Sequence, residues 1–151
     1  MVDIQNQIFN SLKQHIEQNI TNAQVQKDFQ SVASSFPTIT FYEIDNSEFE
    51  HTLDYKQRYS NLAFQIDIFT IGGDKESQAR NISSLVNEVM GDKFHMKRIF
   101  SNQLSNADKD IYRYTMRYSC KIDEQRLLIY SGVKIKEWTR KVEQMKDKKG
   151  E

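Results

Sequence analysis

One segment of the chain, Ile111–Ile122, alternates strictly between apolar and polar residues from Tyr112 onwards. Its apolar positions are Tyr112, Tyr114, Met116, Tyr118, Cys120 and Ile122. A period of two places successive side chains on opposite faces of a strand. The segment therefore predicts a strand with one face in a hydrophobic core. Because it would be longer than most strands, we expect it to project beyond the domain or to curl around it.

Four other segments are typical of strands. Thr38–Ile44 follows Pro37 and is rich in β-branched and aromatic residues. Leu62–Ile68 alternates, which predicts one face towards the core and one towards water or a partner. Phe94–Phe100 alternates less cleanly, and we expect it to form a hairpin with the long strand. Leu127–Tyr130 predicts a short final strand that pairs back.

Two segments have the apolar spacing of amphipathic helices. The first carries one stripe at Ile4, Ile8, Leu12 and Ile16. The second is predicted from Asp74 to Met90, with an apolar face at Ala79, Ile82, Val86 and Val89. We expect Gly72 and Gly73 to form the turn before this helix, Asp74 to cap its first amides, and Gly91 to end it in a left-handed conformation.

These elements predict an α+β fold: a mainly antiparallel sheet of about four to five strands, covered on one face by two helices. A short C-terminal amphipathic helix follows, with a seam at Ile135, Trp138, Val142 and Met145. We divide the chain into a single α+β domain over residues 1–132 and a basic C-terminal helix and tail over 133–151. Two polar stretches are left over: Gln18–Gln30 predicts a loop or a frayed helical extension, and the acidic Asp45–Asp54 predicts an exposed loop.

Charge and composition limit the functional classes. The 151 residues contain 21 Lys and Arg and 21 Asp and Glu, so the net charge of +0 gives no overall field that would hold a nucleic acid or an anionic membrane. A single Cys excludes an intramolecular disulfide framework and a cysteine zinc cluster. No apolar run is long enough for a membrane span, and Met1–Ile20 lacks the apolar region of a signal peptide. We therefore expect synthesis in a reducing cytoplasm.

No residue pattern points to a catalytic, metal or cofactor site, and we expect no enzyme activity. Cys120 lies on the predicted inward face without a nearby His, which is typical of a buried structural thiol. The three histidines, His15, His51 and His95, lack the spacing of a helical metal site. Asp67 lies within a strand, as the metal-binding carboxylate of a nuclease would, but no Glu-x-Lys pair follows it.

The charged residues instead suggest an assembly interface. Arg113, Arg117 and Lys121 share the outer face of the long strand, and the tyrosines between them point the other way, where they cannot stack on bases. The acidic segment and the basic tail separate charge, either for head-to-tail docking of copies or for folding against each other. The predicted interface residues are Arg98, Arg113, Arg117, Lys121, Glu48 and Glu50. We expect reversing the charges of Arg113 and Arg117 to weaken assembly without unfolding the monomer.

The order of these segments resembles the tail terminator (tail completion, head-to-tail joining) proteins of long-tailed bacteriophages. The resemblance covers roughly Ile4 to Tyr130. After an N-terminal helix it runs through the segments FPTITFYEID, NLAFQIDIFTI, ESQARNISSLVNEVM, FHMKRIF and DIYRYTMRYSCKID. The acidic stretch after Asp45 and the basic tail after Gly132 depart from the family pattern.

The resemblance implies a structural virion protein without enzyme activity. Such proteins form a ring, commonly a hexamer, on the head-proximal end of the tail tube, where the ring stops polymerisation and presents a surface for head joining. The implied partners are other copies of the chain, the tail tube protein and a head completion or connector protein, with no membrane and no nucleic acid. The implied location is the virion, and the host cytoplasm during assembly. Two alternatives remain: another neck or connector component, and a small nucleic-acid-binding or nuclease-like domain that uses Asp67 and the basic tail.

Overall fold

The computed structural model describes residues 3–27, 35–51, 53, 58–124 and 128–129. The predicted C-terminal helix therefore lies outside the described residues. In chain order the elements are α1 (Gln5–Asn19), β1 (Gln24–Lys27), β2 (Thr38–His51), β3 (Arg58–Ile71), α2 (Lys75–Asn87), the π-helical turn η1 (Glu88–Lys93), β4 (Lys97–Leu104), β5 (Ile111–Asp123) and β6 (Leu128–Ile129).

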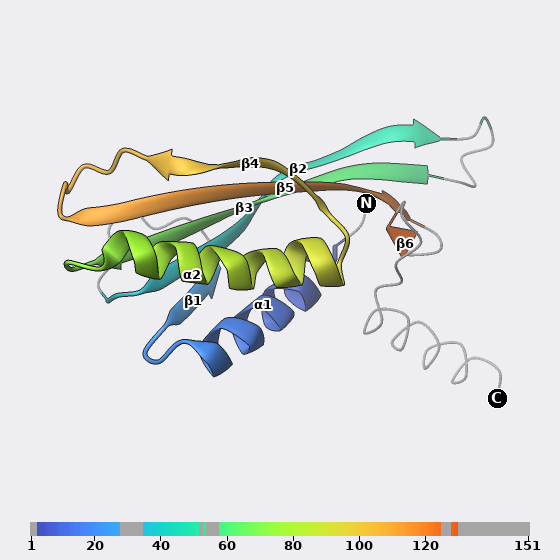
Figure 1. The fold of residues 1–151 in the computed structure, drawn as a ribbon. Coiled ribbons are helices and arrows are strands. Elements are labelled where there is room, and N and C mark those ends of the chain that lie inside the picture. The colour runs from blue at the N-terminus through green and yellow to red at the C-terminus, as the bar shows by residue number, and fades with distance from the viewer. Residues whose placement is uncertain (1–2, 28–34, 52, 54–57, 125–127, 130–151) are drawn as a thin grey trace.

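The predicted α+β class is confirmed, with a mostly antiparallel sheet and two helices. The strands follow the order β1-β2-β3-β5-β4, and the short β6 pairs with β5 beyond the end of β4. Only β1 runs parallel to its neighbour, β2. Both helices lie on the same side of the sheet (Figure 1).

The hydrophobic core lies between these helices and the sheet. The stripe of α1 is confirmed, because Ile8, Leu12 and Ile16 are all fully buried. Ala79, Ile82 and Val86 of α2 are buried beside them. The strands contribute the residues that point towards the helices, including Phe41 and Phe64, whose rings stack 5.2 Å apart between centroids. Burial of these apolar side chains is the main driving force for this packing.

The long strand is confirmed as β5, and it is paired along its whole length. Every residue from Ile111 to Asp123 has a partner in β3. Its inward face is as predicted: Tyr112, Met116, Tyr118 and Ile122 are buried, and Tyr114 and Cys120 pack against the core. Part of the sheet extends past the helices: it is formed by the far end of the β2–β3 hairpin and by the end of β5 that pairs with β3 there (Figure 1).

Two polar stretches contain strands that the sequence did not predict. The acidic segment continues β2 as far as His51, since Asp45 to His51 pair with β3 residues from Ala63 back to Arg58. Backbone pairing with β3 therefore overrides the weak strand propensity of the acidic residues. Within Gln18–Gln30, residues Gln24–Lys27 form β1, held by parallel pairing to β2 and by the buried Val25.

The end of the second helix also differs from the prediction. Gly91 has no left-handed backbone; it lies within η1, which continues α2. A Cβ on Gly91 would lie 3.1 Å from the side-chain oxygen of Asn87. That oxygen accepts a hydrogen bond from the hydroxyl of Tyr118 at 2.9 Å. Gly91 therefore leaves room for the side chain of Asn87, which joins the helix to β5. The strand predicted from Phe94 begins only at Lys97, as β4.

The turn before α2 forms where predicted. Gly72 has a φ of 102°, a conformation that favours glycine. Asp74 takes the N-cap position, but its side chain makes no capping hydrogen bond; its backbone carbonyl accepts from Gln78 instead. The short final strand is present as β6, which pairs with Ile122 and Asp123.

Candidate assembly interface

The face of the sheet that carries no helix holds a buried polar network. We expected alternate residues of β3 to face water or a partner, but all residues from Leu62 to Thr70 are buried. On this side the buried residues include Gln65 and Asp67, and Asp67 is fully inaccessible at 0 % exposure. A buried carboxylate is costly unless it is paired and hydrogen-bonded.

Four side chains on three strands satisfy Asp67. Arg113 Nε donates to Asp67 Oδ1 at 3.2 Å, and the hydroxyl of Thr115 donates to the same oxygen. The other oxygen, Oδ2, accepts from the amide of Gln65 at 3.1 Å and from the hydroxyl of Tyr42 at 3.3 Å. Tyr42 lies on β2, Gln65 on β3 with Asp67, and the other two on β5. The network therefore ties the three central strands together on the side opposite the helices.

The two arginines of the predicted interface row lie over this network. Arg117 Nε donates to Gln65 Oε1 at 2.8 Å, and its guanidinium lies 5.0 Å from the ring centroid of Phe100. The Arg113 guanidinium lies 5.8 Å from the ring centroid of Phe69. Both distances lie within the range in which a guanidinium is attracted to the face of an aromatic ring. Lys121 is the exposed residue of this row, whereas the two arginines are half-buried and have only part of their surface available to a partner.

Burial and the carboxylate together fix the protonation of Tyr42. Burial, then the negative charge of Asp67 and the hydrogen bond to it, raise the pKa of Tyr42 to about 12. Each favours the neutral phenol over the phenolate. Tyr42 therefore remains a hydrogen-bond donor to Asp67 well above neutral pH.

Arg113 is thus a structural partner of a buried charge. Its side chain is 18 % exposed and pairs with a carboxylate that is wholly buried. Removing one partner of such a pair leaves an uncompensated charge and destabilises the fold. This argues against our expectation that reversing the charge of Arg113 would leave the monomer folded. The same saturation leaves Asp67 without the open coordination that a catalytic metal needs.

The other predicted interface residues lie elsewhere. Arg98 is on β4 and points towards the helices, because it pairs with Tyr118 and donates to Asn87 Oδ1 at 3.5 Å. Glu48 is exposed on the far part of β2. Glu50 holds a position on β2 opposite Tyr59, and its side chain lies outside the described residues. The predicted set is therefore not one surface: three residues lie on the helix-free face of β5, Arg98 lies on β4, and two residues lie on the far part of β2.

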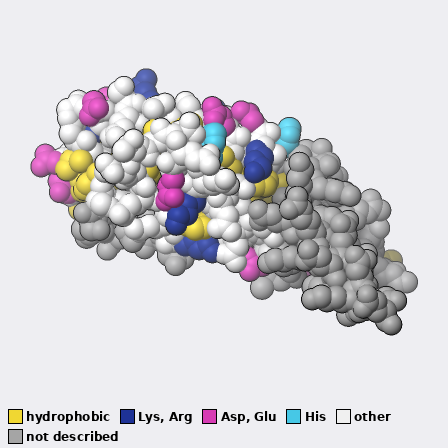
Figure 2. All heavy atoms as spheres, turned by 90° about the horizontal axis from the view of Figure 1, so that it is seen from below, with side chains coloured by type: hydrophobic (Ala, Val, Ile, Leu, Met, Phe, Trp, Pro, Cys, Tyr) yellow, Lys and Arg dark blue, Asp and Glu magenta, His cyan; other side chains and the backbone are white. Residues whose placement is uncertain are grey.

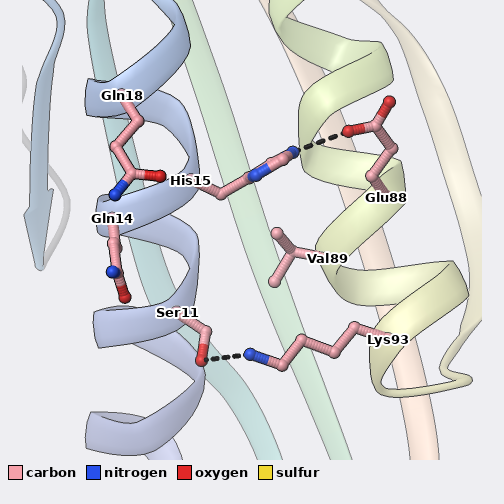
Figure 3. Close-up of a pocket in the computed structure, with 7 residues that line it drawn as sticks. All are labelled: Ser11, Gln14, His15, Gln18, Glu88, Val89 and Lys93. Carbon is pink, nitrogen blue, oxygen red and sulfur yellow. Dashed lines mark hydrogen bonds and ion pairs between the residues drawn. The ribbon is translucent and has the colours of Figure 1, made fainter.

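A contact between the helices was not predicted. His15 Nε2 of α1 lies 2.6 Å from Glu88 Oε2, and Lys93 Nζ donates to Ser11 Oγ at 3.2 Å. Figure 3 shows these side chains reaching across the shallow cleft between α1 and η1 from opposite sides. Such pairs form only once the core has brought the two helices together, so no local sequence signal predicts them.

The remaining candidate residues that the structure describes can be assessed for reactivity and for metal binding. Burial raises the pKa of Cys120 to about 12, so the thiol is protonated at neutral pH, as expected of a structural cysteine. Among the residues that the structure describes, no group of three or more His, Cys, Asp and Glu side chains lies close enough to hold a metal ion. Seen from below the helices, charged side chains of both signs are interspersed (Figure 2).

Comparison with protein-family models gives no match for this chain, and comparison with curated proteins gives none either. Within the described residues, no helix combines the length and the apolar character needed to cross a membrane.

Proposed function

We propose that this chain is a structural protein of a long-tailed bacteriophage that caps the head-proximal end of the tail tube as a ring of identical copies. The ring stops tube polymerisation and provides the surface to which the head connector binds. The single observation that carries the proposal is the order of elements: an N-terminal helix, a long strand pair, a second helix after a glycine turn, and a closing hairpin. This is the order that the resemblance to tail terminators rests on.

The helix-free face supports a role through shape and surface. A network that satisfies a buried carboxylate rigidifies the sheet and fixes its register. Rigid sheets suit a protein whose task is to present the same surface many times around a ring. In this proposal Lys121, the exposed member of the β5 row, contacts the tube or a neighbouring copy.

The test is tail assembly with and without this protein. Cells that produce every other virion component should accumulate overlong tails without heads, and supplying the wild-type chain should restore tails of uniform length. Tails of normal length that join heads in its absence would contradict the proposal. Electron microscopy of the tails gives the length distribution directly.

A second variant locates the surface. Lys121→Glu changes an exposed side chain and should reduce the fraction of capped tails, while the purified variant unfolds at the same urea concentration as the wild type. Capping at the wild-type level would remove Lys121 from the interface without affecting the capping role itself.

A further inference from the structure

The sheet has two stretches of open edge among the described residues. One is the outer edge of β4, which pairs with β5 alone. The other is the far part of β2, because β1 covers β2 only from Thr38 to Phe41. An open edge presents unpaired backbone N–H and C=O groups, which can pair with a strand of another chain.

The two edges carry opposite charges. β4 begins with Lys97 and Arg98, both exposed. The open part of β2 carries the acidic residues Asp45 and Glu48, both exposed. Like charges directly opposite each other destabilise a strand pair, which disfavours pairing of β4 with β4 or of β2 with β2. Opposite charges favour pairing of the β4 edge with the β2 edge of another copy.

Each edge also exposes an isoleucine at a bulge. Ile44 lies at the register shift between Glu43 and Asp45 and is 43 % exposed. Ile99 lies at the shift between Arg98 and Phe100 and is 50 % exposed. Bulges and charges are also the means by which proteins protect an edge from pairing. Large apolar side chains at both bulges weigh against simple protection, because they add apolar surface to the edge.

Strand directions allow the two edges to meet in a repeating arrangement. The antiparallel pairs β2–β3, β3–β5 and β5–β4 make β4 antiparallel to β2. A second copy placed beside the first in the same orientation therefore sets its β4 antiparallel to the first copy's β2. This contact is head-to-tail, and each copy keeps one free edge for the next.

The register within the sheet limits how the copies align. Across the sheet, Leu104 lies in one row with Arg113, Phe69 and Thr38. Without a slide along the strands, residues 101–104 of the second copy would occupy the place of β1. A slide of four rows towards the far end of β2 is the smallest even shift that clears β1, and an even shift keeps each side chain on its own face of the sheet.

The same slide aligns the charges. It sets Arg98 opposite Glu48, both on the helix side of the sheet, and Lys97 opposite the position of Glu50, both on the helix-free side. The steric limit from β1 and the pairing of charge thus select one register independently. Four residues correspond to about 13 Å along a strand, a stagger that tilted strands absorb when a sheet closes around an axis.

We propose that copies of this chain join through the β4 edge of one and the far β2 edge of the next, in the register that sets Arg98 against Glu48. The inference rests on the ring in the proposed function and names the surfaces that build it. In the assembled state, the part of β2 that extends past the helices is therefore paired with β4 of the neighbouring copy.

The test uses two charge-reversed variants of the full chain. Lys97→Glu/Arg98→Glu makes both edges acidic, and Glu48→Lys/Glu50→Lys makes both edges basic. Each variant alone should associate at least tenfold more weakly than the wild type in sedimentation velocity, because every contact now opposes like charges. An equimolar mixture should recover assembly, since acidic and basic copies can alternate. Lys13→Glu/Lys109→Glu, which makes the same charge change at exposed sites away from the edges, should associate as the wild type does.

Disulfide trapping tests the register. Facing residues of neighbouring antiparallel strands are close enough for a disulfide. Arg98→Cys/Glu48→Cys should form intermolecular disulfides on oxidation, and Arg98→Cys/Glu43→Cys, which would face each other without the slide, should not. The opposite preference would overturn the register.

Assembly of the single variants at wild-type strength, or a wild type that remains monomeric at all concentrations, would overturn the edge contact. These outcomes are distinct from failure of the capping role. A chain that assembles through its edges but leaves tail length unchanged refutes capping alone, and normal capping by Lys97→Glu/Arg98→Glu refutes the edge contact alone.

Discussion

From Leu62 to Thr70 of β3, the two faces of the sheet are both buried but are stabilised differently. Towards the helices, β3 contributes Leu62, Phe64, Ile66 and Ile68 to an apolar core. On the other side the same strand contributes Gln65 and Asp67 to a hydrogen-bonded network. The apolar face is held by the amount of surface removed from water, whereas the polar face is held by the geometry of a few directed bonds.

This difference shows what each face can specify. An apolar core tolerates substitutions that conserve volume. A network around a buried charge does not tolerate the loss of a partner, because the charge is then left uncompensated. The network joins β2, β3 and β5, which are the strands whose register places the two charged edges. A protein that assembles through sheet edges benefits from a sheet whose strands cannot slip.

The largest expected effect is on the polar face. Arg113→Glu should lower the free energy of unfolding by at least about 3–5 kcal/mol, because it leaves the buried Asp67 unpaired beside a second carboxylate. Urea denaturation followed by circular dichroism measures this change. Lys121→Glu reverses the charge of an exposed side chain on the same strand, and its free energy of unfolding should stay within about 0.5 kcal/mol of that of the wild type. Equal stability of the two variants would show that the Asp67 network contributes little.

The apolar face should respond to the loss of volume. Ile66→Ala should cost about 2–5 kcal/mol through lost burial and the cavity that remains. Ile71→Ala on the same strand, where the side chain is 45 % exposed, should cost much less. The urea midpoints of the two variants measure both losses of stability, provided that the dependence of the unfolding free energy on urea is the same as in the wild type. A similar cost at the two positions would contradict the assignment of the core to the helix side.

Alkaline pH should weaken the contact between the sheet and α2. Burial raises the pKa of Tyr118 from its ordinary value of 10.0 to about 12, so the folded state holds its proton where the unfolded state loses it. The resulting stability is complete below pH 10 and is lost as the pH rises towards 12. Tyr118→Phe should cost about 1 kcal/mol at neutral pH through the bond to Asn87, and it should flatten the decline in melting temperature from pH 9.5 to 11.5. An unchanged decline would assign the alkaline sensitivity to other groups.

The contact between α1 and η1 should have the smallest effect. The His15 and Glu88 side chains are 34 % and 53 % exposed. Exposed pairs of this kind contribute about 0–1 kcal/mol. His15→Ala should therefore change the unfolding midpoint only slightly, and a loss above about 2 kcal/mol would mean that the cleft stabilises the helix pair more than its exposure suggests.

The sequence predicted the elements whose burial follows one period. β5 and the stripe of α1 were found because a single face of each is apolar. β1 and the far part of β2 were missed because backbone pairing, rather than side-chain pattern, holds them. The partnership of Asp67 with Arg113 was also missed, since it joins residues 46 positions apart in the chain.

The most direct test of the central claim is cryo-electron microscopy of the tail end that faces the head. We predict a ring of this chain on the last tube layer, with the β4 edge of each copy beside the far β2 edge of its neighbour. A neck and tail end in which this chain is absent would contradict the account.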